Sequence, residues 1–431
     1  MKRIWSLLLA FALLMSTACA VETGKVMING TEKRGINIHR TGDNPIEPGI
    51  SPTTGESIAE LAATLKLPET FGGMVKTGKY YPVLVQISNP NGGIGQNAPW
   101  YASYCDIMYE TMLSSDGITR HTAVYNNVYP EIVGPLRSIR THHLGIQAEW
   151  NCPYFFHGKQ DLNVDPLISA LAKARPGTWM SKKLNTVGIL YNGTDGKSKP
   201  YRAGDKHFRV NKTQIDSPNN AGYRLAEIVE EVCPKDWEVA NHNYVFVDAI
   251  DPNLPGDDAS FIYVDWKQAV NNSRLEYDPE NNVYERYVYL KDDPNAAALY
   301  DELTLENPKL VARDKSGEGT FTFEINHGNP ITFTNVIVQY VTIDWNGQGT
   351  QFVPAKMDDI RVDGKIIKNK GDGNADFFMG GKHYQGVWRR DSILDRTVFY
   401  GPDGYEMPML RGKTLIIMMD TKQNRSVSYD P

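Results

Sequence analysis

The sequence lacks an excess of positive charge. Its 431 residues include 45 lysines and arginines against 51 aspartates and glutamates, and the formal net charge is −6. A chain with this balance has no general basic surface, so no nucleic acid partner is expected and any recognition of an anion must be local. With 41% hydrophobic residues, the chain has enough apolar material for more than one hydrophobic core.

Cysteine is also scarce. The chain has only Cys19, Cys105, Cys152 and Cys233, and no C-x-x-C spacing occurs, so a zinc cluster has no support. The three cysteines after Cys19 cannot all pair with one another. A single Cys105–Cys152 disulfide and three buried free thiols are both compatible with the sequence.

Motifs for catalysis and for cofactors are missing as well. The chain contains no G-x-S-x-G elbow, no phosphate-binding P-loop and no dinucleotide-binding fingerprint. His142 and His143 are adjacent and therefore point to different sides of a helix, and no H-E-x-x-H pair is present. We expect no cofactor and no metal ion, and we expect a binding role rather than a catalytic one.

Long hydrophobic runs are confined to the start of the chain. Residues 1–20, MKRIWSLLLAFALLMSTACA, combine two basic residues, an apolar run and small residues, which is typical of a signal peptide. The run is shorter than the roughly 20 residues that span a bilayer. Cleavage after Ala20 would release a secreted protein, whereas the MSTAC segment favours acylation of Cys19 and a lipid anchor on the extracellular face of the membrane.

The rest of the chain divides into three regions that differ in residue pattern. Residues 21–75 are rich in turn-forming residues and predict a polar, flexible tether that ends in a short helix. In residues 76–240 strand and helix patterns alternate, which predicts an α/β layered domain. Residues 241–431 consist of short strand-like runs separated by Asn, Asp, Gly or Pro, which predicts a β-rich domain built as one meander or barrel-like sheet. The expected fold class is therefore α+β.

Two helices and two strands of the α/β region bear on function. The runs YYPVLVQIS and GITRHTAVYNN predict strands. The stretch WYASYCDIMYETML has apolar residues at helical spacing, so Asp106 and Glu110 would share a helix face as an acid, a base or a cation ligand. A second helix is expected over residues 139–150, with Ser138 as its N-cap.

Arginines gather where this second helix begins. Arg137 and Arg140 flank Ser138, and Arg120 lies on the preceding predicted strand. A helix N-terminus offers free N–H groups and a partial positive charge, and guanidinium groups add forked donors that suit phosphate or carboxylate. Arg120, Arg137, Ser138 and Arg140 are therefore candidate anion ligands. The alternative is that the arginines pair with carboxylates of the same chain or face solvent.

Several stretches together resemble a known family, the YerB-like lipoproteins of Gram-positive bacteria, whose function is unknown and whose members have N- and C-terminal parts. In the first part the matching stretches are CDIMYE, GITRHTAVY, GPLRSIR and FFHG. In the second part they are LEYDPENNVYER, TNVIVQYV, GVWRRDSILDRTVFYGPDG and GKTLII. The resemblance implies a membrane-tethered envelope protein that takes part in cell-wall processes.

Two functions follow as expectations. The first is a non-catalytic binding or scaffolding protein of the cell envelope, with a cell-wall enzyme or wall polymer as its partner. The second is a phosphate-handling enzyme that acts on lipid-linked wall precursors through the arginines. This alternative draws on a segment, residues 117–140, that is similar to part of the LytR-CpsA-Psr phosphotransferases.

Overall fold

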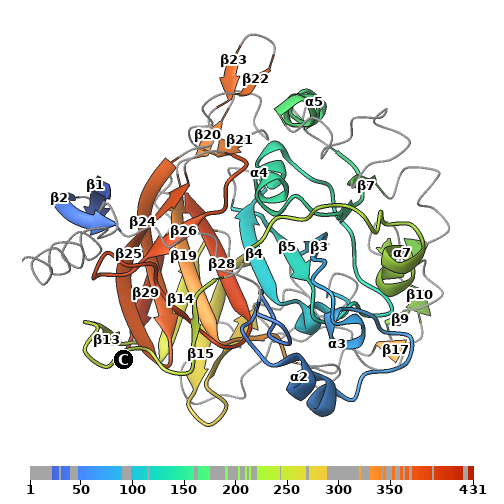
Figure 1. Ribbon diagram of the computed structural model, residues 1–431, viewed down its shortest axis with the longest axis horizontal. Coiled ribbons are helices and arrows are strands. Elements are labelled where there is room, and N and C mark those ends of the chain that lie inside the picture. The colour runs from blue at the N-terminus through green and yellow to red at the C-terminus, as the bar shows by residue number, and fades with distance from the viewer. Residues whose placement is uncertain are drawn as a thin grey trace, which may run out of the picture.

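The computed structural model describes most of the chain from residue 47 onward, together with a hairpin before it (Figure 1). The described residues are 22–28, 31–38, 47–89, 99–113, 117–159, 164–174, 190–192, 202–203, 209–210, 213–214, 221–242, 244–267, 271–288, 320–321, 330–341, 343–345, 352–354, 360–362, 365–367, 371–390, 393–420 and 426–431. The fold is α+β with a strand-rich C-terminal part, which confirms the predicted fold class.

One mixed sheet of eleven strands forms the centre of the molecule. Its order is β13-β25-β24-β19-β28-β4-β5-β3-β6-β7, with β26 paired to β25. The strands from the first part of the chain are β3 (Val83–Ser88), β4 (Ile107–Met112), β5 (Thr119–Tyr125), β6 (Tyr154–Phe156) and β7 (Leu190–Asn192). Those from the second part are β13 (Asp257–Asp258), β19 (Asn335–Val341), β24 (Gly371–Met379), β25 (Lys382–Arg390), β26 (Val398–Tyr400) and β28 (Thr414–Asp420).

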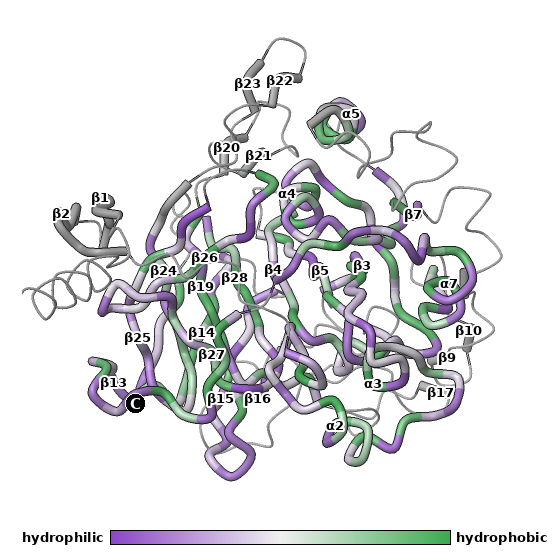
Figure 2. Tube along the Cα trace, viewed as in Figure 1, coloured by the Kyte–Doolittle hydropathy of each residue, from purple (hydrophilic) through white to green (hydrophobic). Residues whose placement is uncertain are grey.

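The two parts of the chain meet inside this sheet. Strand β28 runs parallel to β19 on one side and to β4 on the other, so that Ile417 lies between Val338 and Glu110. In Figure 1 the red β28 stands beside the blue-green β4, and in Figure 2 the hydrophobic stretches run along β19 and β28. The division into residues 76–240 and 241–431 stays a prediction, and the two parts share one sheet.

A second sheet packs against the C-terminal strands. It is antiparallel with the order β18-β16-β15-β14-β29, and Phe378 of β24 contacts Tyr429 of β29 with ring centroids 5.6 Å apart. Its strands are β14 (Phe261–Asp265), β15 (Ser273–Asp278), β16 (Val283–Val288), β18 (Thr332–Phe333) and β29 (Ser426–Asp430). The predicted single meander or barrel is therefore wrong, because the C-terminal strands divide between two sheets.

Helices cover the N-terminal strands. Helix α4 (Thr141–Trp150) is buried along its whole length, so it has no solvent face and is a core element rather than an amphipathic surface helix. The other helices are α2 (Ile58–Leu65), α3 (Met74–Thr77), α5 (Val164–Ala174), α7 (Leu225–Glu231) and the 3₁₀ turn Ala102–Tyr104. No helix among the described residues is long and apolar enough to cross a membrane.

Short strand pairs complete the structure. The first is a hairpin of β1 (Glu22–Ile28) and β2 (Thr31–Ile38), within the predicted tether. The remaining strands are β8 (Arg202–Ala203), β9 (Arg209–Val210), β10 (Thr213–Gln214), β11 (Gly222–Tyr223), β12 (Phe246–Val247), β17 (Thr320–Phe321), β20 (Ile343–Trp345), β21 (Phe352–Pro354), β22 (Ile360–Val362), β23 (Lys365–Ile367) and β27 (Met409–Leu410).

The second half of the predicted tether belongs to the folded body. Ser51, Thr53 and Thr54 are buried, and the Thr53 hydroxyl donates to Asp106 Oδ2 at 2.6 Å. The backbone N–H of Gly412 donates to the Thr54 carbonyl at 2.8 Å. The turn-forming polar residues predicted a solvated segment. Their backbone and hydroxyl groups instead form hydrogen bonds inside the protein, and these bonds offset the free-energy cost of burying polar groups.

The predicted helix over residues 100–113 is wrong. Residues 107–112 form β4, and all six are buried because β28 and β5 flank the strand and other elements cover both faces. A strand covered on both faces does not alternate between polar and apolar residues, so the spacing of its apolar side chains can imitate a helix. The strands predicted at β3 and β5 and the helix predicted at α4 are confirmed.

Candidate anion-binding site

The N-terminus of α4 is built around His143. The helix begins at Thr141, with Arg140 as its N-cap in an extended conformation. The Arg140 backbone N–H donates to His143 Nδ1 at 2.9 Å, so Nδ1 is an acceptor and the imidazole proton lies on Nε2. Nε2 then donates to the Thr111 hydroxyl of β4 at 2.9 Å. This one side chain therefore caps the helix and fixes it to the central sheet.

The N-cap predicted at Ser138 is wrong. The Ser138 hydroxyl donates to the His157 carbonyl at 3.0 Å, and the backbone N–H of Ile139 donates to the Gly158 carbonyl at 3.1 Å. Residues 138 and 139 are therefore held beside the segment that follows β6, and the helix starts two residues later than expected. The preference of serine for N-cap positions gave way to a tertiary hydrogen bond.

The structure gathers all three predicted arginines around His143. Arg120 pairs with Thr111 across β5 and β4, and Thr111 bonds to His143. The Arg137 backbone N–H donates to the Gln86 carbonyl at 2.9 Å, and the Gln86 side-chain amide lies 3.3 Å from His143 Nε2. Arg140 contacts His143 directly, so each arginine is linked to this imidazole by at most one intervening residue.

The guanidinium groups follow a common pattern. Nη1 of Arg120, Arg137 and Arg140 donates to the carbonyl of the preceding residue, at 3.0, 3.2 and 3.1 Å respectively. Each guanidinium is thus folded back along its own backbone, which limits its conformational freedom and pre-organises the group. Arg140 is buried, whereas Arg120 and Arg137 are half-buried.

The charges of Arg120 and Arg140 affect the protonation of the neighbouring histidines. Burial, followed by the charges of Arg140 and Arg120, holds the pKa of His143 well below its usual range. Burial, His143 and Arg140 do the same for His142, whose ring centroid lies 3.8 Å from that of His143. Burial also lowers the pKa of Arg137 to about 10. Both histidines are therefore neutral at physiological pH, and the positive charge of the cluster comes from the arginines.

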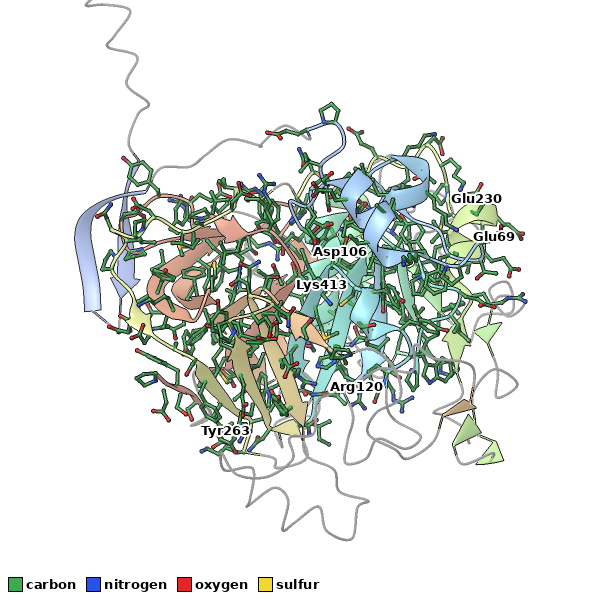
Figure 3. All side chains as sticks on the ribbon, turned by 90° about the horizontal axis from the view of Figure 1, so that it is seen from below. Glu69, Asp106, Arg120, Glu230, Tyr263 and Lys413 are labelled. Carbon is green, nitrogen blue, oxygen red and sulfur yellow. The ribbon has the colours of Figure 1, made fainter. Side chains whose placement is uncertain are left out.

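The two predicted carboxylates do not join the arginines. Asp106 precedes β4 and lies five residues from Thr111, the partner of Arg120, which is about 16 Å along a strand. Figure 3 shows Asp106 and Arg120 well apart along the blue-green strands. Glu110 and Thr111 are neighbours on β4, so Glu110 points to the opposite face of the sheet from Arg120.

Asp106 has a structural role instead, as a buried hydrogen-bond acceptor. Its Oδ2 atom accepts from the Thr53 hydroxyl and from the backbone N–H groups of Asn126 and Asn127, at 2.6, 3.1 and 3.0 Å. Burial outweighs these hydrogen bonds and raises the pKa of Asp106 to about 7. The carboxyl group ties the segment around residue 53 to the end of β5.

Glu110 reaches residues that the sequence did not single out. It is fully buried and lies 3.5 Å from the Arg286 guanidinium of β16, and the side-chain amide of Asn89 donates to it at 2.9 Å. Arg286 lies in a strand-like run in which no local pattern marks it as buried. Only the packing of the second sheet on the first places it inside the protein.

The remaining site predictions have mixed outcomes. The structure has Cys105, Cys152 and Cys233 as buried free thiols, so the Cys105–Cys152 disulfide is wrong. Among the described residues no group of histidine, cysteine and acidic side chains could hold a metal ion. Cys19 lies outside the described residues, and its acylation stays a prediction.

Comparison with known proteins assigns the chain to a family. A family model described as the N-terminal domain of a protein of unknown function, DUF3048, matches residues 72–207, and the model of the C-terminal domain matches residues 309–416. The chain belongs to the DUF3048 family. Its fold is similar to the crystal structure of the YerB protein from Bacillus subtilis, with a TM-score of 0.55 and 17% identity over 88% of this chain and 99% of that one.

These matches confirm the YerB-like resemblance that the sequence indicated. No curated protein matches the chain. The family descriptions carry no activity, and a structural likeness at 17% identity extends to the fold alone. Both parts of a DUF3048 protein contribute strands to the same central sheet here, with the arginine cluster in the N-terminal part.

Proposed function

We propose that this DUF3048 protein is a non-catalytic binding protein of the cell envelope. In this proposal an acylated Cys19 tethers it to the outer face of the membrane, and Arg120, Arg137 and Arg140 bind an anionic group of a wall polymer or of a cell-wall enzyme. The placement of Arg120 and Arg140 beside His143 and Thr111, with Arg137 linked to the same imidazole through Gln86, carries the proposal. The apolar, small-residue start of the chain supports the location.

The geometry favours binding over catalysis. An enzyme that acts on phosphate at these arginines needs an acid or a base within hydrogen-bond reach of the bound group. Asp106 lies toward the other end of β4, and Glu110 points to the other face of the sheet. With Asp106 and Glu110 placed elsewhere, the arginines supply charge and forked donors for recognition, and these two carboxylates give no route for proton transfer to a group bound there.

Binding to cell walls tests this function. Purified protein is sedimented with walls that retain their phosphate-containing polymers and with walls stripped of them. We expect binding to the intact walls only, and we expect added salt to weaken it because the contact is ionic. Arg137→Met with Arg140→Met should weaken binding about 10-fold or more, which corresponds to at least one charged hydrogen bond at about 1.5–3 kcal/mol.

A charge-matched control separates this site from general attraction. Lys382→Met with Lys235→Met also removes two positive charges, but Lys382 pairs with Asp258 and Lys235 pairs with Glu230 at exposed positions, so this variant should leave binding unchanged. Equal binding by the double arginine variant and the wild type would contradict the proposal. Mass spectrometry of the mature N-terminus decides the tether separately, between an acylated Cys19 and a free Val21.

A further inference from the structure

A second cluster of polar side chains lies on the opposite face of β4 and β5. It joins Glu110 and His121, which face each other across these strands, to Arg286 of β16 in the second sheet. All three side chains have no more than 1% of their surface exposed. Asn89 and Asn271, also buried, complete the cluster. Charged groups this deep are rare unless neighbouring groups satisfy them.

One oxygen of Glu110 is well bound and the other is not. Oε1 accepts from the Asn89 amide at 2.9 Å and from the Thr119 hydroxyl at 3.1 Å. Oε2 lies 3.5 Å from Arg286 Nη2 and 3.7 Å from His121 Nε2, both longer than a charge-assisted hydrogen bond of about 2.7–2.9 Å. The ion pair is therefore loose on the side that faces Arg286 and His121.

Donors outnumber acceptors in this cluster. Within the described part of the chain, Arg286 Nε and Nη1, Asn271 Nδ2 and both ring nitrogens of His121 have no hydrogen-bond partner. A buried donor without an acceptor costs about 1–3 kcal/mol, so several of them together strongly favour any acceptor that fits. An oxyanion supplies several acceptor atoms at once, and two or three donors from different strands can bind it together.

The charges of Glu110 and Arg286 determine whether a bound anion needs an additional proton. Arg286 and Glu110 already neutralise each other, so an added anion leaves one uncompensated negative charge in a buried place. His121 can supply the balancing proton because it lies between Glu110, Arg286 and the charge of Arg120. Burial, followed by the charges of Arg286 and Arg120, lowers the pKa of His121, and an anion beside the imidazole would raise it.

We propose that the cluster of Glu110, His121, Asn271 and Arg286 is a buried site for a small monovalent oxyanion of the carboxylate class, which binds together with one proton on His121. This site is separate from the arginine cluster at α4, because it lies on the other face of the same strands. Glu110 and His121 come from the N-terminal DUF3048 part, and Asn271 and Arg286 come from the segment between the two parts. An anion held there would join the two sheets.

Calorimetry on a variant that lacks the arginine cluster at α4 tests this proposal. The whole chain with Arg137→Met and Arg140→Met is titrated with acetate and with sulfate, neither of which changes protonation between pH 6 and pH 8. We expect acetate to bind at a single site, and to bind more tightly at pH 6 than at pH 8, by about tenfold per pH unit where one proton is taken up in full. Divalent sulfate should bind more weakly, because one proton does not balance its charge. His121→Gln in the same background should remove the pH dependence.

Two results would overturn the proposal. One is a folded double variant that does not bind acetate at either pH, and the other is pH-dependent binding of acetate that His121→Gln leaves unchanged. Crystals of the wild-type chain grown in bromide at pH 6 give an independent answer that needs no variant. An anomalous peak within hydrogen-bond distance of Arg286 Nε or Nη1 supports the site, whereas a water at that position with no anomalous signal contradicts it.

Discussion

At the scale of single residues, Asp106 makes a sharp prediction about pH. The pKa of Asp106 is about 7 in the folded protein, above its ordinary value of 3.8, because the group is buried. The folded state therefore holds this proton more tightly than the unfolded state. The stability that protonated Asp106 provides is complete below pH 3.8 and is lost as the pH rises to about 7, by about 1.4 kcal/mol per pH unit.

Asp106→Asn should remove this loss. An asparagine keeps an oxygen that can accept from Thr53, Asn126 and Asn127, and it carries no charge. Urea unfolding at pH 4.5, 6 and 7.5 should therefore show the variant gaining stability relative to the wild type as the pH rises. Thr53→Val, which removes one donor and leaves the carboxyl group, should keep the pH dependence. A difference between Asp106→Asn and wild type that is constant with pH would contradict the burial argument.

At the scale of elements, His143 determines how α4 joins the sheet. The histidine accepts from the backbone of Arg140 and donates to Thr111. Its pKa lies well below its ordinary value of 6.5, so below pH 6.5 the unfolded chain binds a proton that the folded chain does not. Folding stability is thus lost on acidification, by about 1.4 kcal/mol per pH unit from this residue.

His143→Asn should lower the stability and flatten the acid response. The asparagine oxygen can replace Nδ1 as the cap, but the side chain is too short to reach Thr111, so we expect a loss of about 1–3 kcal/mol at pH 7. Between pH 6.5 and pH 5 the slope of folding stability against pH should decrease by about 1.4 kcal/mol per pH unit, which is the contribution of one proton. The slope should not reach zero, because His121, His142 and His242 are also buried with lowered pKa values. His157→Asn, at a half-buried position, is the control. Parallel pH curves for His143→Asn and wild type would contradict the role of His143.

The success of sequence analysis also differed between elements. Strands β3 and β5 were predictable because their ends carry turn-forming residues and their β-branched runs are short. Strand β4 was not, because burial on both faces removed the alternation that identifies a strand. The arginines were found through their position before α4, whereas Arg286 was missed because its burial depends on a second sheet that no local pattern reveals.

At the scale of the whole molecule, the two DUF3048 parts form one folding unit. Strand β28 of the C-terminal part is a central strand that pairs with β4 of the N-terminal part over Thr414–Met418, and Arg286 pairs with Glu110 across the sheets. Separation would expose the edge of β4 and leave a buried charge without its partner on each side. Residues 47–240 and 241–431, expressed alone, should therefore fail to fold cooperatively.

Expressed together, the two fragments should assemble. A tag on residues 47–240 should recover residues 241–431 in equal amount, and the complex should regain a cooperative unfolding transition. Ile417→Pro in the second fragment should abolish recovery, because Ile417 pairs with Glu110 and a proline removes a hydrogen bond from the middle of a sheet. Ser428→Pro places the same change in β29, which among the described strands pairs with β14 alone at the edge of the second sheet, and should leave recovery largely intact. Cooperative unfolding of either fragment alone would show that the shared sheet joins two independent domains.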